Sequence, residues 1–337
     1  MFDSSKISHE YIACCKGSTF VVYSQNLHTK ERTSSNGSTT ALNKWEPPYK
    51  DDAEANIIVL LLHGLNGGTY QFEKLFNTLV SFNYQFISLD FYGHGNSNLF
   101  KNLNKFTEKL YTEQIYDVLK KKNILHANFV IVGFSMGCII ATHLSRDNII
   151  KIKKFCLISA AGIAKPRHRF LVFLLKCNIR LCLWIAKRYS HLLISEDTVK
   201  NEYYDFEKNM EDFTKRYAIL KENQNKFIET FLKVLTGIKL QDSKKYYSAL
   251  LKTDADVLFI YGREDNLTPF SYTLKFLEKK EDCFKNVKMI ILPECCHLVI
   301  HEKFSELIQH LIYFLHINVG LCELFSNDKC TVFLLAM

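Results

Sequence analysis

The heptapeptide VGFSMGC, at residues 132–138, has a serine between two glycines directly after an apolar run. Gly133, Ser135 and Gly137 fit the G-x-S-x-G pattern, in which the serine occupies a strained turn between a strand and a helix. Because so short a pattern also occurs by chance, its meaning depends on its surroundings. NFVIVGFS (128–135) has the continuous apolar run of a strand covered on both faces, and MGCIIATHLSRD (136–147) has helical spacing. The stretch therefore predicts a buried strand, a sharp turn at Ser135 and a helix.

The chain around this stretch alternates between strand-like and helix-like segments. Helical patterns occupy 69–82 and 105–122 in addition to 136–147. Apolar runs that predict strands are found at 11–24 (two strands around a Lys16-Gly17 turn), 56–64, 85–95, 128–135, 154–162, 256–262 and 287–293. Alternating strands and helices imply right-handed crossovers between parallel strands. We therefore expect an α/β fold with a mostly parallel central sheet flanked by helices.

Two segments interrupt this alternation. Residues 26–56 are rich in Ser, Thr, Asn and charged residues, which predicts a mobile surface insertion. Residues 165–250 form a long helical excursion, which predicts a helical cap, or lid. The α/β core is then expected to have an N-terminal part at 1–164 and a C-terminal part at 251–337.

The composition is typical of a soluble globular protein with a large core. Of the 337 residues, 47% are hydrophobic and 23% are charged, and the formal net charge is +8. No nucleic-acid-binding motif accompanies this mild positive charge, so no nucleic acid is expected as a partner. The eleven cysteines lack the spacing of a zinc site, which favours reduced thiols and a cytoplasmic location. No secretory signal and no apolar stretch long enough to span a membrane are expected.

A serine hydroxyl becomes a nucleophile when a histidine takes its proton and an acid orients that histidine. Asp265 follows the predicted strand 256–262, and His297 follows the predicted strand 287–293. Both residues are therefore expected at the carboxyl ends of parallel strands, where open α/β sheets gather their active sites. Ser135, Asp265 and His297 are the candidate catalytic residues.

Neighbouring residues offer alternatives for two of these roles. Glu264 could serve as the acid in place of Asp265, and His301 follows His297 by four residues. Placement at the strand end favours His297. The cysteine doublet at 295–296 is expected to consist of small packing side chains rather than a nucleophile or a metal site. This chemistry requires neither a metal nor another cofactor, and we predict none.

The chain resembles the α/β-hydrolase fold superfamily in four motifs, and their catalytic residues follow the order Ser, Asp, His of that fold. The motifs are HGLNGG at 63–68, LDFYGHGNS at 89–97, GFSMG at 133–137, and GREDNLTP followed by CHLVIHE. The resemblance covers roughly residues 11–316. It is closest to the lidded serine hydrolases, a group that includes monoacylglycerol lipases, lysophospholipases and small-molecule esterases.

This resemblance implies an oxyanion hole formed by the backbone N–H groups of Leu65 and Met136. Two fixed donors would stabilise the negative charge on the former carbonyl oxygen, and losing one such donor typically costs about 3 to 4 kcal/mol. The resemblance further implies that His63 shapes the loop of Leu65. His94, in the turn GHGNS at 93–97, is expected to be structural.

The segment RFLVFLLKCNIRLCLWIAK (169–187) is where we expect information about the substrate. Drawn as one helix, it carries four basic residues within about 20° of one line: Arg169, Lys176, Arg180 and Lys187. Apolar residues cover most of the remaining circumference, and the expected substrate or lid contacts are Phe170, Phe173, Leu174 and Trp184. Two interpretations stay open: a lid helix packed on the core, or peripheral contact of 165–189 with a membrane surface.

Together these features predict a serine hydrolase that cleaves carboxylic esters through an acyl-enzyme intermediate. A lipid-like ester of the monoacylglycerol or lysophospholipid type is the favoured substrate. Small-molecule esterases, amidases or peptidases, and acyltransferases share the same motifs, so the fold does not separate them. A non-catalytic binding protein with this fold is the alternative from a different class. Such a binding protein would not need the Ser135 hydroxyl.

Overall fold

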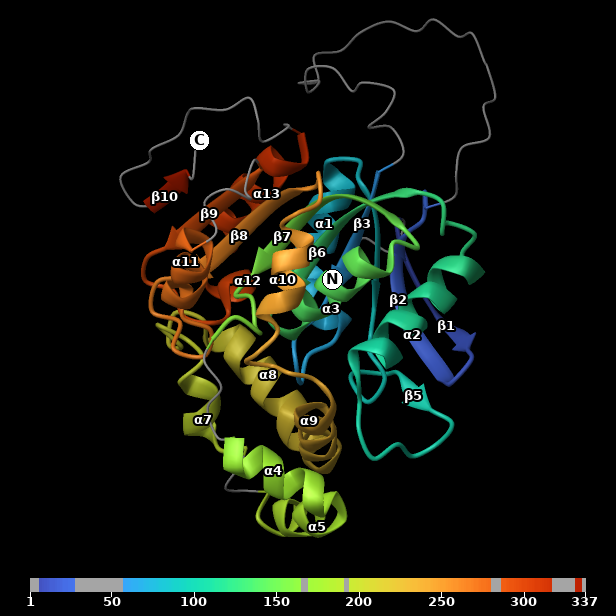
Figure 1. The fold of residues 1–337 in the computed structure, drawn as a ribbon, viewed down its shortest axis with the longest axis vertical. Helices are drawn as coiled ribbons and strands as arrows, with labels where there is room; N and C mark the ends of the chain where they lie inside the picture. Colours follow the sequence, from blue (N-terminus) through green and yellow to red (C-terminus); the bar gives the residue numbers. More distant parts are fainter. Residues whose placement is uncertain are drawn as a thin grey trace, which may run out of the picture.

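The structure, a computed structural model, describes residues 6–27, 57–164, 169–190, 194–279, 286–316 and 331–334. Its strands form one sheet in the order β1-β2-β4-β3-β6-β7-β8-β9-β10, and the short β5 pairs with β2 (Figure 1). The bounds are β1 (Ile7–Cys14), β2 (Gly17–Ser24), β3 (Ile57–Leu62), β4 (Gln85–Leu89), β5 (Asn98–Leu99), β6 (Asn128–Phe134), β7 (Lys151–Ile158), β8 (Asp256–Gly262), β9 (Val287–Leu292) and β10 (Thr331–Leu334).

The centre of this sheet is parallel, and its edges are antiparallel. Each neighbouring pair from β4 through β3, β6, β7, β8 and β9 is parallel. The hairpin of β1 and β2 is antiparallel, β2 pairs antiparallel with β4, and β10 pairs antiparallel with β9. The predicted α/β fold with a mostly parallel sheet is therefore confirmed, and so is the predicted pair of strands around the Lys16-Gly17 turn.

Helices cover both faces of the sheet because alternate strand residues point to opposite sides. In β3, for example, Leu60 belongs to one buried cluster and Leu61 to the other. The first cluster packs against α2 (Glu108–Lys121), α3 (Met136–Asp147), α10 (Lys244–Leu250) and α11 (Phe270–Glu278). The second packs against α1 (Glu73–Ser81), which follows the 3-10 helix η1 (Thr69–Phe72), and against α13 (Phe304–His316).

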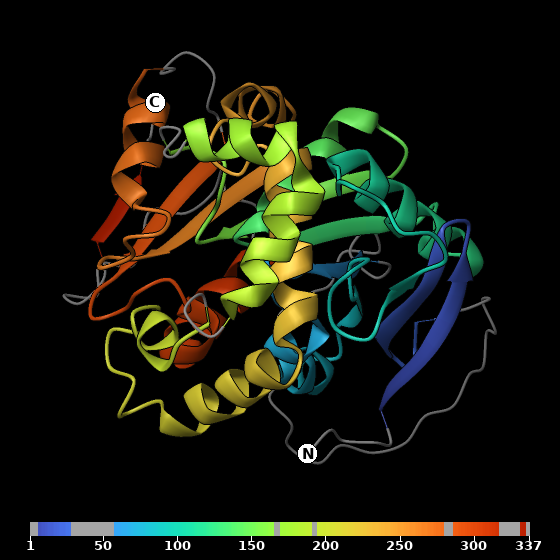
Figure 2. The same cartoon turned by 90° about the horizontal axis from the view of Figure 1, so that it is seen from below.

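Between β7 and α10, the described residues form five helices, which we call the cap. They are α4 (Arg169–Cys177), α5 (Ile179–Arg188), α7 (Glu196–Lys200), α8 (Met210–Glu222) and α9 (Gln224–Gly237). Figure 1 shows them gathered beyond one edge of the core, and Figure 2 views them from the cap side with α4 and α5 in front. Leu175, Ile228 and Leu232 make a small separate cluster where α4 meets α9.

The single helix expected over 169–187 is wrong, because the segment is broken at Asn178. The backbone of Asn178 is not helical, with φ −150° and ψ 78°, and its side-chain oxygen accepts the Leu181 N–H at 3.1 Å. Asparagine is among the best residues at this capping position, so a new helix begins after it. The four basic residues therefore do not share one line, and Lys187 instead forms an ion pair with Glu229 of α9.

Several sequence predictions fall on parts of the chain outside the described residues. These are most of the insertion predicted at 26–56 and the C-terminal segments 317–330 and 335–337. Eight cysteines lie within the described ranges, and all of them are free thiols. No helix in these ranges has the length and apolar character needed to cross a membrane.

Candidate active site

Ser135 occupies a sharp turn between β6 and α3. Its backbone has φ 51° and ψ −112°, a conformation that residues with a side chain rarely adopt. The two glycines beside it allow the close approach that the turn needs. A Cβ on Gly137 would lie 2.1 Å from the Leu62 carbonyl oxygen, and one on Gly133 would lie 2.9 Å from the Cys138 nitrogen. The turn therefore presents the serine at the carboxyl end of β6 and places α3 tightly against β3.

His297 joins Ser135 to Asp265 through one hydrogen-bonded chain. His297 Nε2 lies 3.1 Å from Ser135 Oγ, and His297 Nδ1 lies 2.9 Å from Asp265 Oδ2. The three residues follow three different strands, β6, β8 and β9, at the same edge of the sheet. The Asp265 side chain is fully buried, and that of His297 is 9% exposed. The three residues singled out in the sequence thus lie together with the contacts that a nucleophile, a base and an orienting acid require.

Asp265 is held by donors from its own loop. Its Oδ1 accepts the N–H groups of Leu267 at 2.8 Å and Thr268 at 2.9 Å, and its Oδ2 accepts the Thr268 hydroxyl at 2.6 Å. Burial acts to raise the pKa of this carboxyl group, but the charge of His297 and these hydrogen bonds outweigh it and lower the pKa. Asp265 is therefore ionised at neutral pH, and Thr268 is a site residue that the sequence analysis did not identify.

The same contacts fix the protonation of His297. Because the ionised Asp265 carboxylate can only accept, His297 Nδ1 carries the proton and Nε2 is left as the acceptor facing Ser135. Burial acts to lower the pKa of His297, but the charge and hydrogen bond of Asp265 raise it above 6.5 on balance. The neutral imidazole that predominates above this pKa is able to take a proton from the Ser135 hydroxyl.

The alternative residues face elsewhere. Glu264 Oε2 accepts the Cys295 N–H at 3.0 Å, so this carboxylate holds the histidine loop by its backbone. His301 Nδ1 lies 3.7 Å from Asp212 Oδ2 on α8. In the cysteine doublet at 295–296, burial raises the pKa of both thiols, which disfavours the thiolate that a cysteine nucleophile needs.

The loop after β3 packs directly against the nucleophile. A Cβ on Gly64 would lie 3.2 Å from Ser135 Cβ. His63 accepts the Phe91 N–H at Nε2 (2.9 Å) and donates from Nδ1 to the Gly64 carbonyl (2.7 Å). Burial lowers the pKa of His63 to about 4, so this residue is a neutral structural bridge that shapes the loop. Leu65 follows in the same loop.

The residue His94 is completely buried beside His63, with ring centroids 5.1 Å apart. Burial lowers the pKa of His94 well below its usual range. Its Nδ1 lies 3.3 Å from the Tyr92 carbonyl oxygen. The ring is therefore neutral and packed inside the core.

The structure describes the side chains of three of the four residues predicted to contact substrate from the cap. Phe173 and Trp184 are 62% and 67% exposed, and Leu174 is exposed beside them. The side chain of Phe170, within α4, is outside the described residues. The three described side chains are thus open to solvent.

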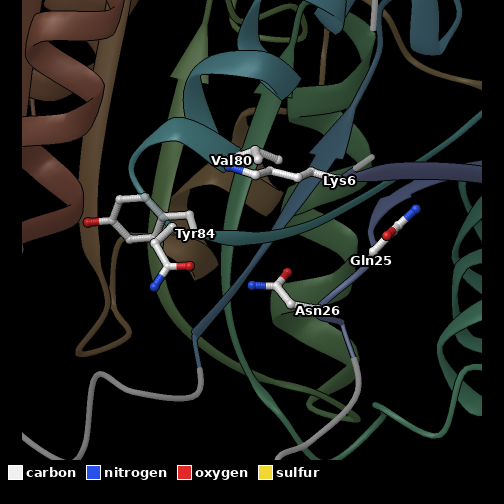
Figure 3. Close-up of a pocket in the computed structure, with 6 residues that line it drawn as sticks. Lys6, Gln25, Asn26, Val80 and Tyr84 are labelled. Atoms are coloured by element: carbon white, nitrogen blue, oxygen red, sulfur yellow. The ribbon is translucent and has the colours of Figure 1, made fainter. Parts of the chain in front are cut away.

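A polar cavity lies away from this site. It has a volume of about 300 Å³ and lies between the β1–β2 hairpin and the end of α1 (Figure 3). Its lining residues are Lys6, Gln25, Asn26, Val80, Asn83 and Tyr84, none of which belongs to the hydrogen-bonded chain of Ser135. In the described part of the chain, no group of three His, Cys, Asp or Glu side chains is arranged to hold a metal ion.

Known proteins match both the sequence and the fold. Residues 57–304 match the family model described as the alpha/beta hydrolase fold. Lipid droplet hydrolase 1 of Saccharomyces cerevisiae is 23% identical over 276 residues, which cover 73% of this chain and 72% of the yeast protein. A thermophilic esterase from Thermogutta terrifontis superposes with a TM-score of 0.66 at 16% identity, over 92% of this chain and 98% of its own. An esterase from Exiguobacterium antarcticum gives a TM-score of 0.66 at 16% identity, over 92% and 100%.

Proposed function

This chain belongs to the α/β-hydrolase fold family, and we propose that it hydrolyses carboxylic esters with Ser135 as the nucleophile. The observation that carries the proposal is the continuous chain of hydrogen bonds from Asp265 through His297 to Ser135. Fold alone does not identify a reaction, whereas this arrangement of side chains is that of a nucleophile with its base. The names of the yeast relative and of the two solved esterases are consistent with ester hydrolysis.

In the proposed mechanism, His297 Nε2 takes the proton of Ser135 as the Oγ attacks the ester carbonyl carbon. Asp265 keeps the imidazole oriented and stabilises its positive charge. When the tetrahedral intermediate collapses, the carbon–oxygen bond of the ester breaks, and the imidazolium gives its proton to the departing alcohol. A water molecule then gives a proton to His297 as it attacks the acyl-enzyme, and the acid is released with Ser135 restored.

The backbone N–H groups of Leu65 and Met136 are our proposed oxyanion donors. Met136 is the first residue of α3, where a helix leaves its N–H groups without partners inside the helix. Among the described residues neither amide donates a hydrogen bond. The contact between Gly64 and Ser135 brings the Leu65 loop to the nucleophile, which supports this pairing.

Hydrolysis of p-nitrophenyl esters by the purified protein and its Ser135→Ala variant tests the proposal. We expect hydrolysis by the wild type and none above background in the variant, and a fluorophosphonate probe should label the wild type alone. Ser145→Ala is the matched control, because Ser145 lies on the same helix α3 without a hydrogen bond from its hydroxyl to a described residue. If Ser135→Ala hydrolysed the esters as fast as Ser145→Ala, Ser135 would not be the nucleophile.

For the substrate we propose a lipid-like ester, delivered at a lipid surface by the outer face of α4 and α5. Of the fourteen large apolar side chains exposed in the described ranges, six lie within residues 173–189: Phe173, Leu174, Leu181, Trp184, Ile185 and Tyr189. Exposed apolar side chains gathered in this way mark an interaction surface. Figure 2 shows α4 and α5 in front of the core when the molecule is seen from the cap side.

The charges of the same segment favour a lipid surface as its partner. Residues 165–195 contain seven Lys or Arg and no Asp or Glu. Basic side chains beside aromatic and aliphatic ones suit an interface of lipid headgroups, and each cation near an anionic surface contributes about 1 kcal/mol. The eight free cysteines further support our proposal of a reducing, cytoplasmic location.

Vesicle co-sedimentation separates this surface from the chemistry. We would use the inactive Ser135→Ala chain with vesicles of phosphatidylcholine, alone or mixed with phosphatidylserine. Adding Phe173→Ser and Trp184→Ser should weaken binding about 100-fold or more, because each of the two buried aromatics contributes about 1.5 to 3 kcal/mol. Phe100→Ser is the matched control, since Phe100 is 68% exposed but lies outside the cap. Equal binding by the double variant and this control would refute the proposed surface.

In the active chain, the same pair of substitutions distinguishes lipid-like from small esters. Rates on an ester series of rising acyl length should fall selectively for the long chains. An equal fall for short and long chains would contradict a lipid-directed role of the cap.

A further inference from the structure

The carboxylate of Glu302 connects the cap to the loop that carries His297. Glu302 ends the short helix α12 (Val299–Glu302). Its Oε2 accepts the Cys296 N–H at 2.9 Å, and its Oε1 accepts the Tyr204 N–H at 2.6 Å and the Asp205 N–H at 3.3 Å. One side chain therefore holds two backbone segments that are far apart in the sequence.

The first of these segments is the histidine loop itself. Cys296 directly precedes His297 in the loop between β9 and α12. Glu294, earlier in the same loop, has φ 52°, a left-handed conformation that surrounding contacts must maintain. The Cys295 N–H donates to Glu264 Oε2 at 3.0 Å. Two carboxylates thus hold consecutive amides just before the imidazole, and Glu302 supplies the nearer one.

The second segment is the connection between α7 and α8 in the cap. Glu202, two residues before Tyr204, forms an ion pair with the buried Arg216 of α8, with 2.5 Å between Oε2 and Nη1. This pair ties the connection to the body of the cap. The hydrogen bonds from Tyr204 and Asp205 to Glu302 then tie it to the core beside His297.

We propose that Glu302 is a positioning residue that couples the packing of the cap on the core to the orientation of the His297 imidazole. The proposal rests on the role of His297 as the base in the proposed function. Glu302 touches neither His297 nor Ser135 through its side chain, so it acts through the Cys296 backbone. When the cap moves away from the core, the Tyr204 and Asp205 amides move away from the Glu302 carboxylate. Glu302 can then move, and the histidine loop is held less firmly.

The Glu302→Gln variant tests this coupling with little change of shape. An amide has one acceptor oxygen and one donor NH₂ group. The glutamine oxygen can therefore accept the N–H groups of one segment, but its NH₂ group would face the N–H donors of the other segment. Glu306→Gln, at the start of α13, is the matched control, because the Glu306 side chain makes no hydrogen bond or ion pair with a described residue of the histidine loop or the cap. Both variants remove one negative charge from the same region.

We expect kcat of Glu302→Gln to fall about 10-fold to 100-fold, the effect of losing a hydrogen bond to a charged group. The midpoint of its pH–rate profile should also move to lower pH, because a displaced imidazole loses part of the Asp265 contact that raises the pKa of His297. A purely structural role would lower the melting temperature without moving this midpoint. Wild-type kcat and midpoint in Glu302→Gln, matching those of Glu306→Gln, would overturn the proposal.

Hydrogen exchange in the Ser135→Ala chain tests the clamp without any catalysis. Adding Glu302→Gln should speed the exchange of peptides that contain Tyr204 and of those that contain Cys296, whereas Glu306→Gln should change neither. Faster exchange at the cap segment alone would overturn the coupling and leave Glu302 as a cap anchor. If the wild type failed to hydrolyse any ester, the proposed function would fall, and the exchange result would still decide whether the clamp exists.

Discussion

Replacing Gly137 by alanine tests whether the tight contact of α3 with β3 positions the nucleophile. The added Cβ would lie 2.1 Å from the Leu62 carbonyl oxygen and 3.0 Å from that of His63, whereas ordinary contact begins at 3.4 Å. Both contacts are with backbone atoms, which cannot rotate away as a side chain can. Either α3 or the end of β3 must therefore shift by about 1.3 Å, the difference between 2.1 Å and 3.4 Å. Ser135 directly precedes α3, and Leu65 follows β3.

A displacement of about 1 Å in a catalytic arrangement can reduce the rate about 100-fold, and overpacking destabilises a fold by about 1 to 3 kcal/mol. We expect kcat/KM for a short p-nitrophenyl ester to fall by about that factor in Gly137→Ala, with a lower melting temperature. Gly17→Ala is the matched control, because its Cβ would meet the Asn98 carbonyl oxygen at 2.0 Å where β2 pairs with β5, at the sheet edge. It should lose stability similarly and keep its kcat/KM. Wild-type kcat/KM in Gly137→Ala would refute the reasoning.

Two further predictions concern the acid and the base. Because His297 accepts a proton only when neutral and its pKa is raised, kcat/KM should increase with pH through a midpoint above 6.5, and a midpoint below 6.5 would contradict the assigned contacts. In Asp265→Asn, the charge that raises this pKa is removed while burial remains, so the midpoint should move to lower pH. The kcat of the same variant should fall about 10⁴-fold, because an amide no longer holds the required tautomer of His297. A kcat equal to that of the wild type would exclude Asp265 as the acid.

The core elements could be predicted because their signals are local. A strand buried on both faces is apolar at every position, so the range predicted at 256–262 coincides with β8 and the helix predicted at 136–147 coincides with α3. Asp265 and His297 each follow such a strand within five residues, and parallel strands bring their carboxyl ends to one edge. The candidate triad could therefore be named before any contact was known.

The break between α4 and α5 could not be predicted in this way, because apolar residues continue on both sides of it. Leucines and isoleucines occur on both sides of Asn178, and the capping bond from Leu181 separates α4 from α5. The sequence also does not show whether an apolar helix face is exposed, because such a face has the same residue types at the surface and in the core. The sequence therefore indicated Phe173 and Trp184 as residues that contact substrate, and only the structure shows that both are exposed.

The sequence by itself determined the parallel sheet, the turn at Ser135 and the sheet edge where Asp265 and His297 meet it. Burial of a strand on both faces requires a continuous apolar run, and the turn requires glycines beside the serine, so both features are visible in short stretches of sequence. Only the tertiary structure decided which side chains complete the site. Glu302 and Tyr204 are 98 positions apart, and their hydrogen bond exists because the cap returns to the core beside the histidine loop. Such a contact depends on the path of the whole chain, so no local pattern of residues predicts it.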